Sequence, residues 1–160
     1  MQSGKILAAE HQGSYVIKLV GDVRLTLCTT IDDYFDSMFS CPDFVGVIID
    51  LSEVVGIDST SLGLLAKLAI RARKKFNLVP IILCPDPDIL RLLESMGFRQ
   101  VFDIREDLDI TNDDLDELDV KSADENCIRD KIIESHRVLM EMNEKNRKTF
   151  ASLMTTLETC

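Results

Sequence analysis

Three hydroxyl side chains follow one another at the predicted start of a long helix. Ser59, Thr60 and Ser61 come directly after Asp58, and a β-branched run that is expected to be buried precedes them at residues 44–49. A hydroxyl at a helix start can accept hydrogen bonds from the free amides of the first turn. It can also carry a phosphate, because those amides and the helix dipole favour negative charge. The pattern therefore leaves two interpretations open, a helix cap and a phosphorylation site.

A catalytic role for Ser59 is not favoured by the rest of the sequence. The only histidines are His11, predicted in a turn, and His136, predicted on the surface of a C-terminal helix, and no Gly-x-Ser-x-Gly motif is present. Gly56 and Gly63 lack the companions of a phosphate-binding loop. The five cysteines form no C-x-x-C pair, and no histidine stands at metal-ligand spacing. We therefore expect no catalytic residue, no metal site, no cofactor and no enzyme activity.

The elements that must position the hydroxyl cluster can be read from hydrophobic periodicity and turn signals. Strands are predicted at residues 6–8, 15–20, 44–49, 78–84 and 100–104, and helices at 30–39, 59–76 and 86–97. An opening hairpin followed by alternating strands and helices indicates an α/β fold with a mixed β-sheet and helices packed against it. This unit is expected to span residues 1–105.

The segment around the hydroxyls is similar to the signature loop of a known family. Residues 57–63 (IDSTSLG), after residues 47–52 (VIIDLS), resemble the loop of the STAS domain family, specifically of bacterial anti-sigma-factor antagonists. Residues 20–24 (VGDVR) resemble the segment that follows the family's second strand. The resemblance covers roughly residues 5–105 and implies a STAS-like fold.

What the resemblance implies for function is a phosphorylation-controlled protein-binding switch. Ser59 is the implied phosphorylation site, Asp58 its acidic neighbour, and Leu62 and Gly63 place the helix close against the sheet. The family has glycine where this chain has Ser61, so Thr60 and Ser61 stay open as alternative acceptors. The implied partner-binding surface consists of Asp22, Arg24, Asp58, Thr60, Ser61 and Leu62.

The resemblance also implies the partners. The unphosphorylated form would bind an anti-sigma factor and free the sigma factor, a serine kinase would inactivate the protein, and a PP2C-like phosphatase would restore it. A phosphate beside Asp58 would abolish docking by charge repulsion and desolvation, without unfolding the domain. The alternative is a non-switching scaffold module whose C-terminal helix mediates assembly or recruits a second effector.

The composition limits the kinds of partner and the cellular location that we expect for the protein. The net charge is −10, with ten basic against twelve acidic residues in 1–102 and eight against sixteen in 103–160. Nucleic acid is a poor partner for such a chain, because phosphate neutralisation supplies most of that affinity. No run approaches the roughly 20 apolar residues of a membrane span, and no signal peptide is recognised. An odd number of scattered cysteines favours reduced thiols, so we expect a cytoplasmic protein with no membrane partner.

The C-terminal third consists of two segments of different composition. Residues 106–122 are rich in acidic side chains and are predicted to be a solvated linker. Residues 123–160 are predicted to form one long amphipathic helix. Its stripe is Ile128, Ile132, Ser135, Leu139, Met142, Asn146, Phe150, Leu153 and Leu157. The stripe needs a partner, and folding back, self-association and binding of another protein all remain open.

Overall fold

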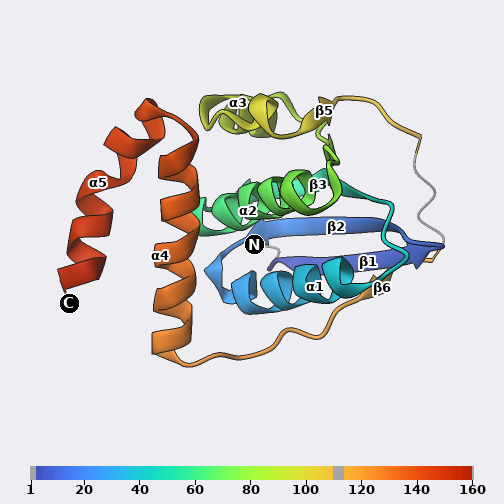
Figure 1. Ribbon diagram of the computed structural model, residues 1–160, viewed down its shortest axis with the longest axis horizontal. Helices are drawn as coiled ribbons and strands as arrows, with labels where there is room; N and C mark the ends of the chain where they lie inside the picture. Colours follow the sequence, from blue (N-terminus) through green and yellow to red (C-terminus); the bar gives the residue numbers. More distant parts are fainter. Residues whose placement is uncertain (1–2, 110–113, 160) are drawn as a thin grey trace.

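A six-stranded mixed sheet forms the centre of the protein, in the order β5-β4-β3-β2-β1-β6 (Figure 1). The computed structural model describes residues 3–109 and 114–159. The strands are β1 (Lys5–His11), β2 (Ser14–Val23), β3 (Gly46–Ile57), β4 (Ile81–Leu83), β5 (Asp103–Arg105) and β6 (Asp116–Glu117). The mixed α/β fold predicted from the sequence is confirmed.

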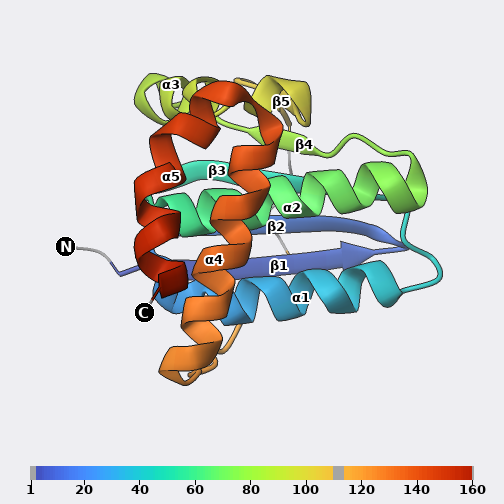
Figure 2. The same ribbon diagram turned by 60° about the vertical axis from the view of Figure 1, so that its left-hand side comes forward.

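Helices connect the strands and close the C-terminal end. They are α1 (Cys28–Ser40), α2 (Ser59–Phe76), α3 (Pro87–Ser95), α4 (Glu125–Met142) and α5 (Glu144–Thr159), with short 3-10 turns η1 (Leu25–Leu27) and η2 (Phe98–Gln100). Figures 1 and 2 show α1 and α2 side by side, with α4 running across the ends at which both helices begin.

The strand directions bring the site together. β1 and β2 form an antiparallel hairpin around Gln12 and Gly13, both with positive φ, whereas β2, β3, β4 and β5 are parallel neighbours. In the ladder between β2 and β3, Val23 pairs with Ile57. Parallel strands joined by helices place the helix starts at the carboxyl edge of the sheet. The segment after β2 and the start of α2 therefore lie together.

The element boundaries agree with the sequence where local signals are strong. α2 occupies the predicted residues 59–76, and α3 begins with an Asp86 cap and Pro87 and is followed by Gly97 at φ +84°. The strand predicted at 44–49 is longer, because β3 pairs with β2 along nearly its whole length. The strand predicted at 78–84 is limited to β4, and the one at 100–104 is replaced by η2 and the later β5.

The C-terminal segment differs from the single helix that its periodicity predicted. Asn143 is extended and separates α4 from α5. Its side-chain oxygen accepts a hydrogen bond from the Asn146 amide (2.8 Å), which caps the start of α5. The two helices pack as a hairpin, and an ion pair joins Arg137 to Glu158. We call this hairpin, residues 125–159, the C-terminal arm.

The acidic linker is partly structured. Asp116 and Glu117 form β6, which pairs antiparallel with Ala8 and Leu7 of β1 at the edge of the sheet. Farther on, the Lys121 amide donates to the Thr30 hydroxyl of α1 (2.8 Å). Residues 114–122 of the predicted linker thus follow the body of the domain on the way to α4, whereas residues 110–113 lie outside the described part of the chain.

Candidate functional site

Asp58 joins two segments of the site with one carboxylate. Its Oδ1 accepts a hydrogen bond from the Ser61 amide (2.9 Å), which caps α2, and its Oδ2 accepts one from the Leu25 amide (2.7 Å), which fixes the turn after β2. The cap argument had pointed to one of the three hydroxyls, but a carboxylate at the preceding residue satisfies the helix start instead. The Ser59 hydroxyl is therefore available for another contact.

That contact is made by His136 of α4. The distance from Ser59 Oγ to His136 Nε2 is 2.8 Å, and His136 Nδ1 lies 2.7 Å from the Ile132 carbonyl oxygen. Because a carbonyl oxygen only accepts, Nδ1 donates to it, and in a ring with a single proton Nε2 is then the acceptor for the Ser59 hydroxyl. The prediction that His136 lies on the helix surface is wrong. Its side chain is only 1% exposed, and its ring packs edge-on against Phe150 at 5.0 Å.

The three hydroxyls of the motif have different environments. Ser59 is half-buried, whereas Thr60 and Ser61 are 4% and 1% exposed. The Ser61 hydroxyl has no hydrogen-bond partner among the described residues. Ser59 is therefore the most accessible acceptor of the three in this arrangement.

The predicted partner-binding residues divide into two groups. Asp22 and Arg24 lie at the end of β2, where Arg24 Nε donates to both carboxylate oxygens (2.9 and 3.0 Å) and its side chain is well exposed. Thr60, Ser61 and Leu62 are buried, and Asp58, which lies between the two groups, is half-buried. Arg24 is exposed, and Asp22, Asp58 and Ser59 are in part open to a partner.

Gly63 marks the point at which α2 and α4 cross. A Cβ atom at this position would lie 2.3 Å from the Ser135 carbonyl oxygen and 2.6 Å from the Ser135 Cβ. The expectation that Gly63 places the helix against the sheet is therefore corrected, because the glycine faces α4. The absence of a side chain lets two helix backbones come into direct contact.

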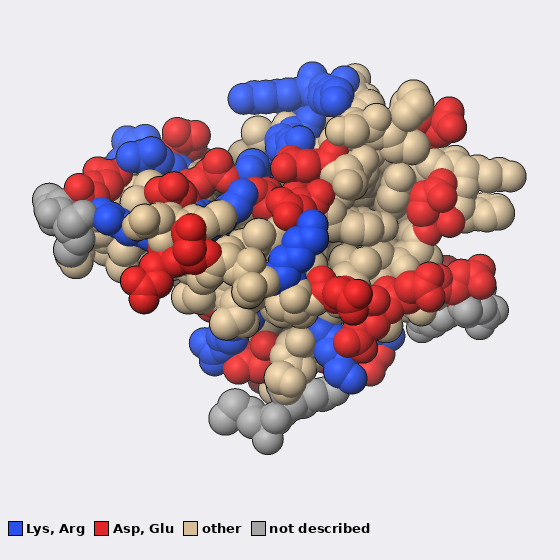
Figure 3. Space-filling view, turned by 90° about the horizontal axis from the view of Figure 1, so that it is seen from below, with Lys and Arg blue, Asp and Glu red and all other residues tan. Residues whose placement is uncertain are grey.

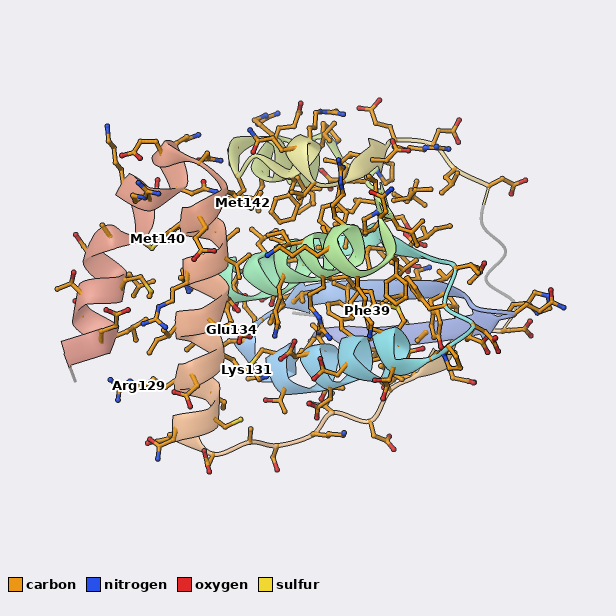
Figure 4. All side chains as sticks on the ribbon, viewed as in Figure 1. Phe39, Arg129, Lys131, Glu134, Met140 and Met142 are labelled. Carbon is orange, nitrogen blue, oxygen red and sulfur yellow. The ribbon has the colours of Figure 1, made fainter. Side chains whose placement is uncertain are left out.

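A group of charges fastens α4 next to this crossing. Asp32 of α1 is buried and forms ion pairs with Lys131 and with Lys67 (3.1 Å), and Lys67 also pairs with Glu134 (2.6 Å). Figure 4 shows Lys131 and Glu134 on α4 beside the two sheet-covering helices. Burial by itself would raise the pKa of Asp32, but the hydrogen bond from Lys131 and the charge of Lys67 outweigh it and lower that pKa.

The Ser59–His136 pair has the distance of a nucleophile and its base, but not the surroundings. Nδ1 of His136 faces a backbone carbonyl instead of an orienting carboxylate, and Phe150 encloses the ring. Among the residues that the structure describes, no three histidine, cysteine or acidic side chains are grouped to hold a metal ion. The geometry fits a contact between helices that shields a serine.

The surface charge is mixed. On the face seen in Figure 3, acidic and basic side chains are interspersed over the described residues, without a continuous basic patch. Within the described part of the chain, no helix combines the length and the apolar character required to cross a bilayer. The mixed charge of the face in Figure 3 does not favour a polyanion as partner.

Fold and site together define a small α/β domain with a serine at a capped helix start. The STAS domain family matches residues 5–110, and the chain belongs to that family. Among solved structures, the unphosphorylated form of the anti-sigma factor antagonist SpoIIAA is similar, with 16% identity and a TM-score of 0.53, over 65% of this chain and 89% of that one. Comparison with curated proteins finds no significant match. The C-terminal arm lies outside the residues matched by the family.

Proposed function

We propose that this chain is an anti-sigma factor antagonist, a protein-binding switch controlled by phosphorylation of Ser59. The observation that carries the proposal is the position of that serine. It is the first residue of α2, its hydroxyl takes no part in the cap because Asp58 fills that role, and it lies next to the end of β2. The family membership and the SpoIIAA-like fold support this assignment.

The chemistry of the switch follows from the helix start. A phosphate on Ser59 adds about −1.5 to −2 charge near the amides of the first turn, which tolerate an anion. A partner docked over Asp22, Arg24 and the start of α2 would meet that charge next to Asp58. Its binding would be lost through repulsion and desolvation, while the fold survives.

The other components of the cycle are separate proteins. The chain is the substrate of a serine kinase and of a PP2C-like phosphatase, and it acts in the cytoplasm as a binding module without catalysis of its own. A non-switching scaffold is not favoured, because Leu139 and Phe150 of the apolar stripe are buried in the hydrophobic core of the same chain.

The test compares Ser59→Ala, Ser59→Asp and a control, Ser37→Asp, expressed in the native cells. Ser37 is an exposed serine near the far end of α1, away from the start of α2. Mass spectrometry of the wild-type protein should find phosphate on Ser59. An anti-sigma factor, recognised by its own binding to a sigma factor, should co-purify with Ser59→Ala and with Ser37→Asp.

The same anti-sigma factor should be lost from Ser59→Asp. The purified proteins should repeat this difference in a direct titration, with affinity at least ten-fold weaker for Ser59→Asp. Equal binding by Ser59→Ala and Ser59→Asp, or phosphate absent from Ser59 under all growth conditions, would refute the switch.

A further inference from the structure

The surface around Ser59 is already occupied by a helix of the same chain. Figure 2 shows α4 lying across the beginnings of α1 and α2. The contact includes the hydrogen bond to Ser59, and Gly63 lies directly under the backbone of α4. Of the six residues that the family resemblance assigns to partner binding, three are buried, namely Thr60, Ser61 and Leu62.

Three α4 residues spaced four apart present complementary groups to that surface. Lys131 pairs with the buried Asp32, Ser135 crosses Gly63, and Leu139 is fully buried. Residues four apart lie on one face of a helix. The surface therefore accepts a helix with a basic residue, a small residue and a large apolar residue at successive turns.

The far end of the arm is fastened at a second place. The side-chain amide of Asn146, which is buried, donates to the Met96 carbonyl oxygen at the end of α3 (2.9 Å), and Asn143 donates to the same oxygen (3.4 Å). The arm is thus attached to the domain at two places, through the three-residue face of α4 and through these asparagine contacts. An external helix would have to replace only α4 over α1 and α2.

Phosphorylation of Ser59 would remove one contact of α4. The Ser59 hydroxyl and His136 Nε2 share a 2.8 Å hydrogen bond, and the buried imidazole packs against Phe150. A phosphorylated Oγ has no proton to donate to Nε2, so this hydrogen bond cannot form. Phosphorylation of Ser59 should therefore weaken the docking of α4.

We infer that the joint surface of α1 and α2 at Asp32, Ser59 and Gly63 is a binding surface for an amphipathic helix, and that α4 is its resident occupant. The external partner presents a helix of the pattern Lys/Arg-x3-small-x3-Leu and gains access by displacing α4. The identification of that partner as the anti-sigma factor rests on the proposed function, whereas the occupancy of the surface does not.

The experiment opens the arm without altering the surface beneath it. The full-length double variant Lys131→Glu/Ser135→Leu places an acid next to Asp32 and a bulky side chain at the helix crossing. The matched control is Lys148→Glu/Ser152→Leu, the same two changes four residues apart on exposed positions of α5. Hydrogen exchange followed by mass spectrometry reports the protection of residues 125–142.

A fluorescein-labelled peptide of residues 124–143 is the probe. The opened variant should bind it at least ten-fold more tightly than the wild type and the control variant do, as measured by fluorescence anisotropy. A peptide carrying Lys131→Glu and Ser135→Leu should not bind. The opened variant should also lose protection in 125–142 by at least ten-fold while β3 stays protected.

Two results would overturn the inference. One is unchanged protection of residues 125–142 in the opened variant, and the other is an exposed surface that fails to bind the peptide. If β3 also loses protection, the milder His136→Ala variant is judged by the same two criteria. The peptide assay contains no anti-sigma factor, so it tests the helix-binding surface separately from the switch. If the peptide binds but the Ser59 variants bind the anti-sigma factor equally well, the switch is rejected and the helix-binding surface is retained.

Discussion

Ser59 and His136 are 77 residues apart in the sequence and share a 2.8 Å hydrogen bond. The serine belongs to the STAS domain, and the histidine belongs to an arm outside the matched residues. The contact ties the residue with the proposed regulatory role to the part of the chain that the family does not share. A displacement of α4 should therefore break the hydrogen bond to Ser59 and expose its hydroxyl.

Gly63→Ala should destabilise the protein by about 2 kcal/mol, because the new Cβ would overlap the backbone of Ser135. On an isolated helix the same change would be stabilising by roughly 1 kcal/mol. Gly46→Ala is the control, since nothing lies within 4 Å of a Cβ at that position. Urea denaturation measures both. A Gly63→Ala variant as stable as the wild type would contradict the close crossing of α2 and α4.

Asp32 should make the free energy of unfolding depend on pH in the acidic range. Its pKa is lowered in the folded state, so its contribution is present above the unfolded value of about 3.9 and is lost as the pH falls through the lower folded value. Asp32→Asn should therefore cost about 3 kcal/mol at pH 7, because Lys131 and Lys67 lose their buried partner. The difference from the wild type should shrink below about pH 4. Denaturation across pH tests this, and a pH-independent difference would contradict it.

Asp58→Ala should destabilise the protein more than the loss of an ordinary helix cap. The variant loses the cap on Ser61 and the bond to Leu25, for a cost of about 2–3 kcal/mol. Asp86→Ala is the comparison, because Asp86 caps α3 through local amides alone and should cost about 1 kcal/mol. Equal effects in thermal or urea unfolding would show that the bond to Leu25 contributes nothing.

Cys84 should resist alkylation. Burial raises the pKa of its thiol to about 11, and the side chain is fully enclosed in the core. The thiolate is the reactive form, so iodoacetamide at pH 8 should leave Cys84 unmodified while the half-exposed Cys41 and Cys127 react. Peptide mass spectrometry of the native protein gives the answer. Labelling of Cys84 as fast as that of Cys41 would mean that the core opens readily.

The parts of the fold that the sequence predicted are those with strong local signals. The extent of α2 followed from its apolar and basic residues, and the Asp86-Pro87 pair with Gly97 delimited α3. The length of β3 was underestimated, because its second half is held by the ladder with β2 and not by an apolar run. Asn143 could have been read as the cap of a second helix, but the continuous stripe concealed the break.

The sequence by itself determined the α/β order, the hydroxyl cluster after Asp58 and the amphipathic character of the C-terminal segment, because each depends on residues close together in the chain. Only the tertiary structure decided that Asp58, not a hydroxyl, caps α2, that Gly63 faces another helix, and that His136 is buried against Ser59. These relationships join segments that periodicity treats separately. The surface on which the stripe of α4 packs is determined by shape and charge in the folded chain. Here Gly63 allows the close approach of α4, and Asp32 pairs with Lys131.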